Sequence, residues 1–211
     1  MYWYIGYYYL LILSSLTYGA MTVRRRSPLS YRLLLWWLIA TVPTEVMASV
    51  MARVYHNNLC VYNIWEPFDC CMVLLMFYFG IVHKTTRRMF RWLLVLVPAG
   101  FVLFNLWHFI ALAWHIRSML FYLFCELIGA CLFLIDGLLP GEEQAIFQRS
   151  FVWMAFGTIL YCIIYILTHA LWEYIQVWPT WIYEVLVGIA NTFDYLGVWL
   201  ALYALRKRPG R

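Results

Sequence analysis

Apolar residues run along this chain in long blocks that short polar segments separate. Seven of these blocks have about 20 residues, the length that a helix needs to cross the hydrocarbon core of a membrane. They cover residues 2–21, 31–53, 65–83, 90–114, 118–139, 150–171 and 181–205. Because the blocks use nearly the whole chain, the sequence predicts an all-α polytopic membrane protein. Residues 1–211 form a single seven-transmembrane-helix bundle in this prediction.

The composition supports a membrane protein and excludes several other classes. Hydrophobic residues make up 65% of the chain and charged residues 12%, and the mean hydropathy is +0.75. A soluble domain carries about 25% charged residues. A soluble globular domain, a disordered chain and a nucleic-acid-binding module are therefore excluded, although the net charge is +5. Membrane lipids are the first partner that this composition implies.

The cysteines predict neither a disulfide framework nor a metal site. Among the six, only Cys60 lies in a predicted loop, and the others lie inside apolar blocks. Cysteine in such surroundings is a small packing residue. The spacing also lacks the paired thiolates of a zinc site, so the sequence implies no metal and no cofactor.

The basic residues predict the orientation. Arg24–Arg26 follow the first block, and no basic residue precedes it, so the block is expected to be a membrane span rather than a cleavable signal peptide. Lysine and arginine concentrate on the cytoplasmic side of membrane proteins. With the N-terminus outside and the C-terminus inside, 13 of the 15 lysines and arginines are cytoplasmic, and only Arg53 and Arg117 are outside. Tyr7–Tyr9 lie near a span end, where the interface favours aromatic rings.

A faint internal repeat is present. Arg32, Trp36 and Thr41 recur 117 positions later as Arg149, Trp153 and Thr158. The first three and last three spans also share their orientation, which predicts a parallel 3+1+3 arrangement like that of some small transporters. A chance match in a chain with 12 tryptophans is the alternative.

Polar residues inside the spans are the candidate ligand-binding groups, since ionisable residues in a membrane are costly and usually face the protein interior. In the second span, Thr41, Glu45 and Ser49 follow at four-residue steps and share one helix face. With the predicted orientation, most polar groups lie in the outer half of the bundle, with Glu66 and Asp69 near its outer edge. We predict an outward-facing acidic cavity. Its candidate lining residues are Glu45, Glu66, Asp69, His108, Glu126, Asn191 and Asp194.

The charge of this set indicates the type of ligand. Its five carboxylates have no lysine or arginine at their depth. Such groups either take up a proton or attract a cation, so a cation, an amine or a polyol is the expected ligand. The structural alternative is that the acids only hydrogen-bond between helices. In that case Arg53 and Arg117 are expected to pair with Glu66 and Glu126 at the rim.

The sequence lacks the residues that several known membrane-protein functions require. Lys84 and Lys207 are the only lysines and both lie at inner span ends, so the chain has no lysine to hold retinal in its last span. The sequence contains neither the GxSxG motif of a serine hydrolase nor the HExxH motif of a zinc protease. An enzyme is therefore less expected than a binding protein.

The order of short motifs resembles a family of small seven-transmembrane-helix proteins common in Bacteroidota. The residues that carry the resemblance are Arg26-Ser27-Pro28, Leu33-Leu34-Leu35, Glu45, Asn58, Tyr62, Glu66-Pro67-Phe68, Glu126 and Asn191. The family commonly has a histidine before this asparagine, where Gly188 and Ile189 stand here. The resemblance implies the seven-span topology and the importance of Glu45, Glu66 and Glu126. We expect the bundle to lie in a bacterial inner membrane.

The leading functional hypothesis is a ligand-binding sensor or an accessory subunit of a membrane complex. The short tail at residues 206–211 carries no output domain, so signalling would need a protein partner or a homo-oligomer. Small residues in the last span, such as Gly188, Gly197, Ala201 and Ala204, offer a lateral face for that partner. The alternatives are a small-solute or cation transporter, a lipid-modifying enzyme using Glu126 and His108, and a membrane accessory protein of an antiphage system.

Overall fold

The computed structural model describes residues 2–105, 116–139, 146–171 and 179–207. These residues form seven α-helices and one π-helical segment, with no β-strand among them. The helices are α1 (Tyr2–Thr22), α2 (Leu29–Val54), α3 (Leu59–Tyr78), α4 (Lys84–Gly100), α5 (Ile116–Leu138), α6 (Ile146–Ala170) and α8 (Thr180–Arg206), and η1 (Phe101–Asn105) continues α4. The predicted all-α class is confirmed.

Two helices differ in their bounds from the apolar blocks. Helix α3 begins at Leu59, six residues before the predicted span. The side chain of Asn57 accepts a hydrogen bond from the Leu59 amide at 2.9 Å, which satisfies one of the free amides at a helix start. Helix α4 begins at Lys84, because charged residues extend a helix into the polar boundary that hydropathy alone does not detect.

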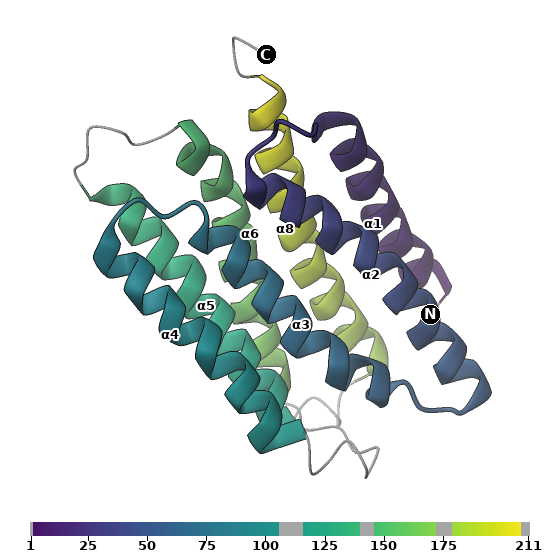
Figure 1. Ribbon diagram of the computed structural model, residues 1–211. Helices are drawn as coiled ribbons and strands as arrows, with labels where there is room; N and C mark the ends of the chain where they lie inside the picture. Colours follow the sequence, from purple (N-terminus) through teal and green to yellow (C-terminus); the bar gives the residue numbers. More distant parts are fainter. Residues whose placement is uncertain (1, 106–115, 140–145, 172–178, 208–211) are drawn as a thin grey trace.

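Six helices form a closed ring around one axis. Each contacts the next in the order α1, α2, α3, α5, α6, α8, and α8 returns to α1. Helix α4 lies outside this ring and packs on α3 and α5, as Figure 1 shows. The turn between α1 and α2, the turn between α3 and α4 and the C-terminal end of α8 lie at the same end of the bundle (Figure 1). We call it the basic end, because Arg24–Arg26, Lys84 and Arg206 are exposed there.

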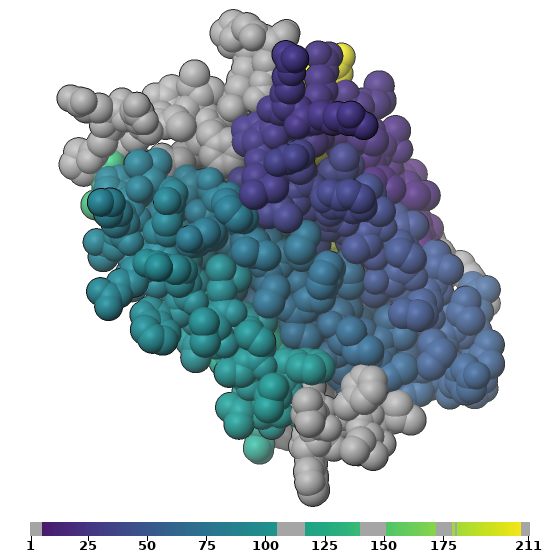
Figure 2. All heavy atoms as spheres, viewed as in Figure 1, coloured from purple at the N-terminus to yellow at the C-terminus, as the bar shows by residue number. Residues whose placement is uncertain are grey.

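The outer surface of the helices is apolar. Leu10, Trp36, Leu103 and Leu138 are between 63% and 83% exposed, whereas a soluble protein rarely exposes large continuous apolar areas. In Figure 2 the side chains of α2, α3 and α4 cover the viewed face continuously. Five helices, α2, α3, α5, α6 and α8, are long and apolar enough to cross a membrane. The chain therefore has the character of a multi-pass membrane protein.

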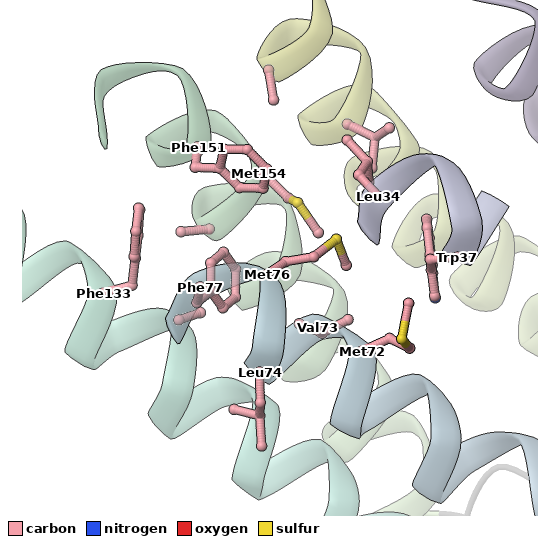
Figure 3. Close-up of a cluster of buried hydrophobic side chains, with 14 of the residues drawn as sticks. Leu34, Trp37, Met72, Val73, Leu74, Met76, Phe77, Phe133, Phe151 and Met154 are labelled. Atoms are coloured by element: carbon pink, nitrogen blue, oxygen red, sulfur yellow. The ribbon is translucent and has the colours of Figure 1, made fainter. Parts of the chain in front are cut away.

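The half of the bundle nearer the basic end is filled by a hydrophobic core. Leu34 from α2, Phe77 from α3, Phe133 from α5 and Phe151 from α6 are at most 1% exposed. The rings of Phe77 and Phe133 are stacked with centroids 5.1 Å apart. Figure 3 shows Met76 and Met154 pointing toward each other beside Phe77, on the side away from Phe133. Methionine fills such irregular gaps well, and this packing closes the centre of the ring at this level.

Helices α6 and α8 approach each other through two glycines. A methyl group added at Gly157 would lie 2.6 Å from the carbonyl oxygen of Phe193, and one added at Gly197 would lie 2.8 Å from that of Trp153. Ala201 is also fully buried. The expectation that Gly197 and Ala201 offer a lateral face to a partner is therefore wrong. Small residues let helix backbones pack closely, and here they do so inside the bundle.

The carboxylate of Asp136 fixes the turn between α3 and α4. It is fully buried and accepts hydrogen bonds from the backbone amides of Val82 and His83 at 3.0 and 3.2 Å. The His83 Nδ1 atom lies 3.0 Å from the same carboxylate. One side chain on α5 therefore satisfies two backbone donors just before α4 begins.

Replacing Asp136 with asparagine is expected to lower the free energy of unfolding by about 1–3 kcal/mol, the usual cost of an unsatisfied buried donor. The amide nitrogen of asparagine would face one of the two backbone N–H groups. Thermal denaturation in detergent measures this change. The His83→Ala variant is the control and should lose less, since both backbone bonds remain. Equal melting temperatures for wild type and Asp136→Asn would contradict this role.

Candidate functional site

A cavity of about 470 Å³ lies in the half of the bundle opposite the basic end. All six helices of the ring contribute to its wall, and no described residue of α4 does. Its volume is in the range of small-molecule sites in proteins. The lining residues are Tyr8, Tyr9, Glu45, Ser49, Asn58, Leu59, Tyr62, Trp65, Glu66, Asp69, Met119, Tyr122, Leu123, Glu126, Tyr161, Tyr165, His169, Tyr183, Val187 and Asn191.

Three carboxylates reach the cavity at the same depth. Glu45 lies nine residues before the end of α2, and Asp69 and Glu126 each lie ten residues after the start of α3 and α5. At 1.5 Å per residue, Glu45 is about 14 Å from the C-terminal end of α2, and Asp69 and Glu126 are each about 15 Å from the N-terminal ends of α3 and α5. Asp69 lies further from the start of its helix than the apolar block predicts, because α3 begins six residues before that block.

Tyrosines from two neighbouring helices hold Glu45. The Tyr8 hydroxyl on α1 donates to Glu45 Oε1 at 3.1 Å, and the Tyr62 hydroxyl on α3 donates to Oε2 at 3.2 Å. Tyr9 donates to the Glu45 carbonyl at 3.2 Å and lies 2.7 Å from Ser49 Oγ. Pro43 lies inside α2, two residues before Glu45. Both carboxylate oxygens of Glu45 therefore have a fixed position in the wall.

Asp69 and Glu126 also receive hydrogen bonds from neighbouring helices. The Trp37 indole nitrogen on α2 donates to Asp69 on α3. Cys162 Sγ on α6 lies 3.8 Å from Glu126 Oε2. These contacts position the carboxylates but supply no positive charge to neutralise them.

The acids are close enough to repel each other. Asp69 interacts electrostatically with Glu45, Glu126 and Asp194, and Glu126 also interacts with Asp194. The lining contains four carboxylates and, among the described residues, no lysine or arginine. A cation or a proton in the cavity would relieve this repulsion.

One wall of the cavity is aromatic. On α6, Tyr161, Tyr165 and His169 follow at four-residue steps, with ring centroids 4.7 Å and 5.2 Å apart. The ring of Tyr183 from α8 meets His169 edge to face at 6.0 Å. In the ring of helices, α6 stands opposite α2, so this wall lies across the cavity from the helix that carries Glu45.

The structure places five of the seven predicted site residues in the cavity wall, namely Glu45, Glu66, Asp69, Glu126 and Asn191. Asp194 is not in the wall. It lies one turn deeper on α8, where Thr158 donates to it at 3.4 Å. His108 lies outside the described residues, and no position is given to it.

Arg53 and Arg117 do not neutralise the cavity acids. Both are exposed, and within residues 2–105 and 116–139 neither forms an ion pair with Glu66 or Glu126. The pairing that the structural alternative expected at the rim is therefore not observed.

Sequence reasoning missed the tyrosines that bond Glu45. Tyr8 and Tyr9 were expected at the membrane interface, yet their hydroxyl groups bond the inward face of α2. The spacing of Tyr161, Tyr165 and His169 is visible in the sequence, and it was the available signal for the aromatic wall.

Comparisons with family models, with curated proteins and with solved structures find no match to this chain.

Proposed function

We propose that this protein binds a small cationic ligand in its acidic cavity and acts as a sensor or as an accessory subunit of a membrane complex. The observation that carries the proposal is the group of Glu45, Asp69 and Glu126 around one cavity at one depth. No lysine or arginine of the described chain shares that wall. Uncompensated carboxylates in a low dielectric favour the binding of positive charge.

The proposal includes the topology. All seven helices span a bacterial inner membrane, with the N-terminus outside and the basic end in the cytoplasm. The exposed Arg24–Arg26 at one end of the bundle support this orientation, which opens the cavity to the outside. Membership of the seven-transmembrane-helix family common in Bacteroidota is also part of the proposal.

Binding is favoured over transport by the hydrophobic core. Phe77, Phe133 and Phe151 fill the ring between the cavity and the basic end, so a solute would meet a closed layer there. The proposed 3+1+3 repeat has some support, because Thr41 and Thr158 are both buried while Trp36 and Trp153 are both exposed. Transport would require this layer to open.

A protein partner is part of the proposal, because a sensor or an accessory subunit acts through the protein that it contacts. The apolar outer surface that carries Leu10 and Trp36 is available to lipid or to another helix. A lipid-modifying reaction of Glu126 with His108 is not part of the proposal, because His108 lies outside the described residues.

The test is ligand-dependent thermal stability of the purified protein in detergent. Sodium, calcium and choline chlorides are titrated at constant ionic strength. A ligand at a hundredfold excess over its Kd stabilises the folded state by about 2.7 kcal/mol, which raises the melting temperature by several degrees.

The matched variants separate the cavity from general charge effects. Glu126→Gln removes a cavity carboxylate and is expected to reduce the stabilisation by at least half. Glu184→Gln removes an acid of α8 outside the cavity wall and should behave like wild type. The proposal fails if none of the three salts stabilises the protein, or if Glu126→Gln responds as wild type does.

A further inference from the structure

The acids line the wall of the cavity and do not converge on a single position where a metal ion could bind. Glu45, Asp69 and Glu126 come from three different helices and enclose a space of about 470 Å³. Among the described residues, no three His, Cys, Asp or Glu side chains form a group that could hold a metal ion. Calcium takes six to eight oxygens at 2.3–2.6 Å, and this arrangement does not supply them. The negative charge suits a larger cation.

The aromatic wall supplies the second feature that such a cation needs. The faces of aromatic rings carry negative charge density, and they attract a cation that lies within about 6 Å of the ring centroid. Tyr161, Tyr165 and Tyr183 line the cavity together with Trp65. Alkyl groups on a nitrogen can pack against these rings, whereas a hydrated metal ion gains less from them because it keeps its water.

A buried hydroxyl group in the wall has no hydrogen-bond partner among the described residues. Tyr122 lines the cavity and is only 2% exposed. Its hydroxyl oxygen is buried and forms no hydrogen bond with the described chain. Buried polar groups are normally hydrogen-bonded, and leaving one unsatisfied is costly. A ligand that carries an N–H or O–H group beside its positive charge would satisfy it.

We infer that the ligand of this cavity is an organic ammonium ion, held between the carboxylates of α2, α3 and α5 and the aromatic wall of α6 and α8. This inference rests on the proposed cation-binding function and names its ligand class. Glu45 and Asp69 compensate the charge of the nitrogen, the rings of Tyr161 and Tyr165 contact its alkyl groups, and Tyr122 receives the polar group.

Wild-type protein provides the first test. Isothermal titration calorimetry compares choline, ethanolamine and tetramethylammonium with potassium and calcium ions. It also compares choline with 3,3-dimethyl-1-butanol, which has the same shape and no charge. At least one ammonium probe is expected to bind tenfold or more tightly than either metal ion, and choline tenfold more tightly than its neutral analogue.

Two variants of one residue test the aromatic wall. Tyr165→Leu removes the ring and keeps an apolar side chain, so the affinity for the best ammonium probe should fall five- to tenfold. Tyr165→Phe keeps the ring, so its affinity should stay within twofold of wild type. Circular dichroism verifies that both variants are folded. If Tyr165→Leu does not fold, the comparison of ligands on the wild-type protein still tests the inference.

The outcomes distinguish the two proposals. If a metal ion binds and no ammonium probe does, the inference is wrong and the proposed cation-binding function stands. If choline and its neutral analogue bind equally, or if nothing binds, both proposals are overturned. If an ammonium probe binds but Tyr165→Leu and Tyr165→Phe weaken it equally, the aromatic wall does not recognise the charge.

Discussion

Replacing Gly157 with alanine is expected to destabilise the bundle by about 2–4 kcal/mol, because overpacked sites at which nothing can relax lie at the upper end of such substitutions. The added methyl group would lie 2.6 Å from the Phe193 carbonyl oxygen and 3.1 Å from the Gly197 Cα atom. Both obstacles are backbone atoms, so only a separation of α6 from α8 can relieve the contact. That separation would also break the hydrogen bond between Thr158 and Asp194, because Thr158 directly follows Gly157 and Asp194 directly follows Phe193.

The measurement is the free energy of unfolding in mixed micelles. Gly197→Ala should show a similar loss, since its methyl group would meet the Trp153 carbonyl at 2.8 Å. Gly6→Ala and Gly137→Ala are matched controls, because a methyl group at either position meets nothing within 4 Å. A Gly157→Ala variant as stable as these controls would contradict the close packing of α6 on α8.

Replacing Asp69 with asparagine is expected to weaken cation binding about ten- to hundredfold, equivalent to about 1.4–2.8 kcal/mol. Asp69 interacts electrostatically with Glu45, Glu126 and Asp194, so removing its charge lowers the attraction of this group for a cation. The asparagine oxygen can still accept the Trp37 hydrogen bond, which leaves the position of the side chain unchanged. Calorimetric titration with the best cation from the panel measures the loss.

Although Asp69→Asn should bind the cation more weakly, its free energy of unfolding should not fall. Without ligand, the variant is expected to be at least as stable as wild type, since the substitution removes repulsion among the acids. Binding sites often carry such a cost in stability. Lower affinity together with lower stability would indicate a structural role for Asp69, and unchanged affinity would remove it from the site.

The sequence predicted the helices well because their cause is local. Apolar blocks and helix length are properties of single segments, so five of the seven expected spans overlap their helices closely, and α3 and α4 each begin six residues before their blocks. The third helix begins before its apolar block because its first six residues, 59–64, include Asn63 and follow two asparagines, and these polar residues interrupt the block. A helix start that depends on the Asn57 side chain is not visible to hydropathy.

The cavity acids were also predictable in part. Helical spacing and the lack of basic residues at the same depth selected Glu45, Asp69 and Glu126 from the sequence alone. Their partners were not predictable, because bonds such as Tyr8 to Glu45 and Trp37 to Asp69 join separate helices. Spacing along one helix carries no information about the rotation of its neighbour.

The small residues of α8 illustrate the same limit. A stripe with Gly197 and Ala201 is typical of a close helix contact, whether the neighbouring helix belongs to the same chain or to a partner. Only the position of Gly157 on α6 decides between these cases. The sequence identified the type of contact and not its partner.

A density map of the purified protein with a saturating ammonium probe tests the central claim most directly. The map is inspected between Glu45, Asp69 and Glu126 on one side and Tyr161 and Tyr165 on the other. The account predicts a non-protein density there, with the nitrogen near the carboxylates and the alkyl groups against the rings. An empty cavity, or one whose carboxylates bond only to each other, would contradict the account and make these acids structural.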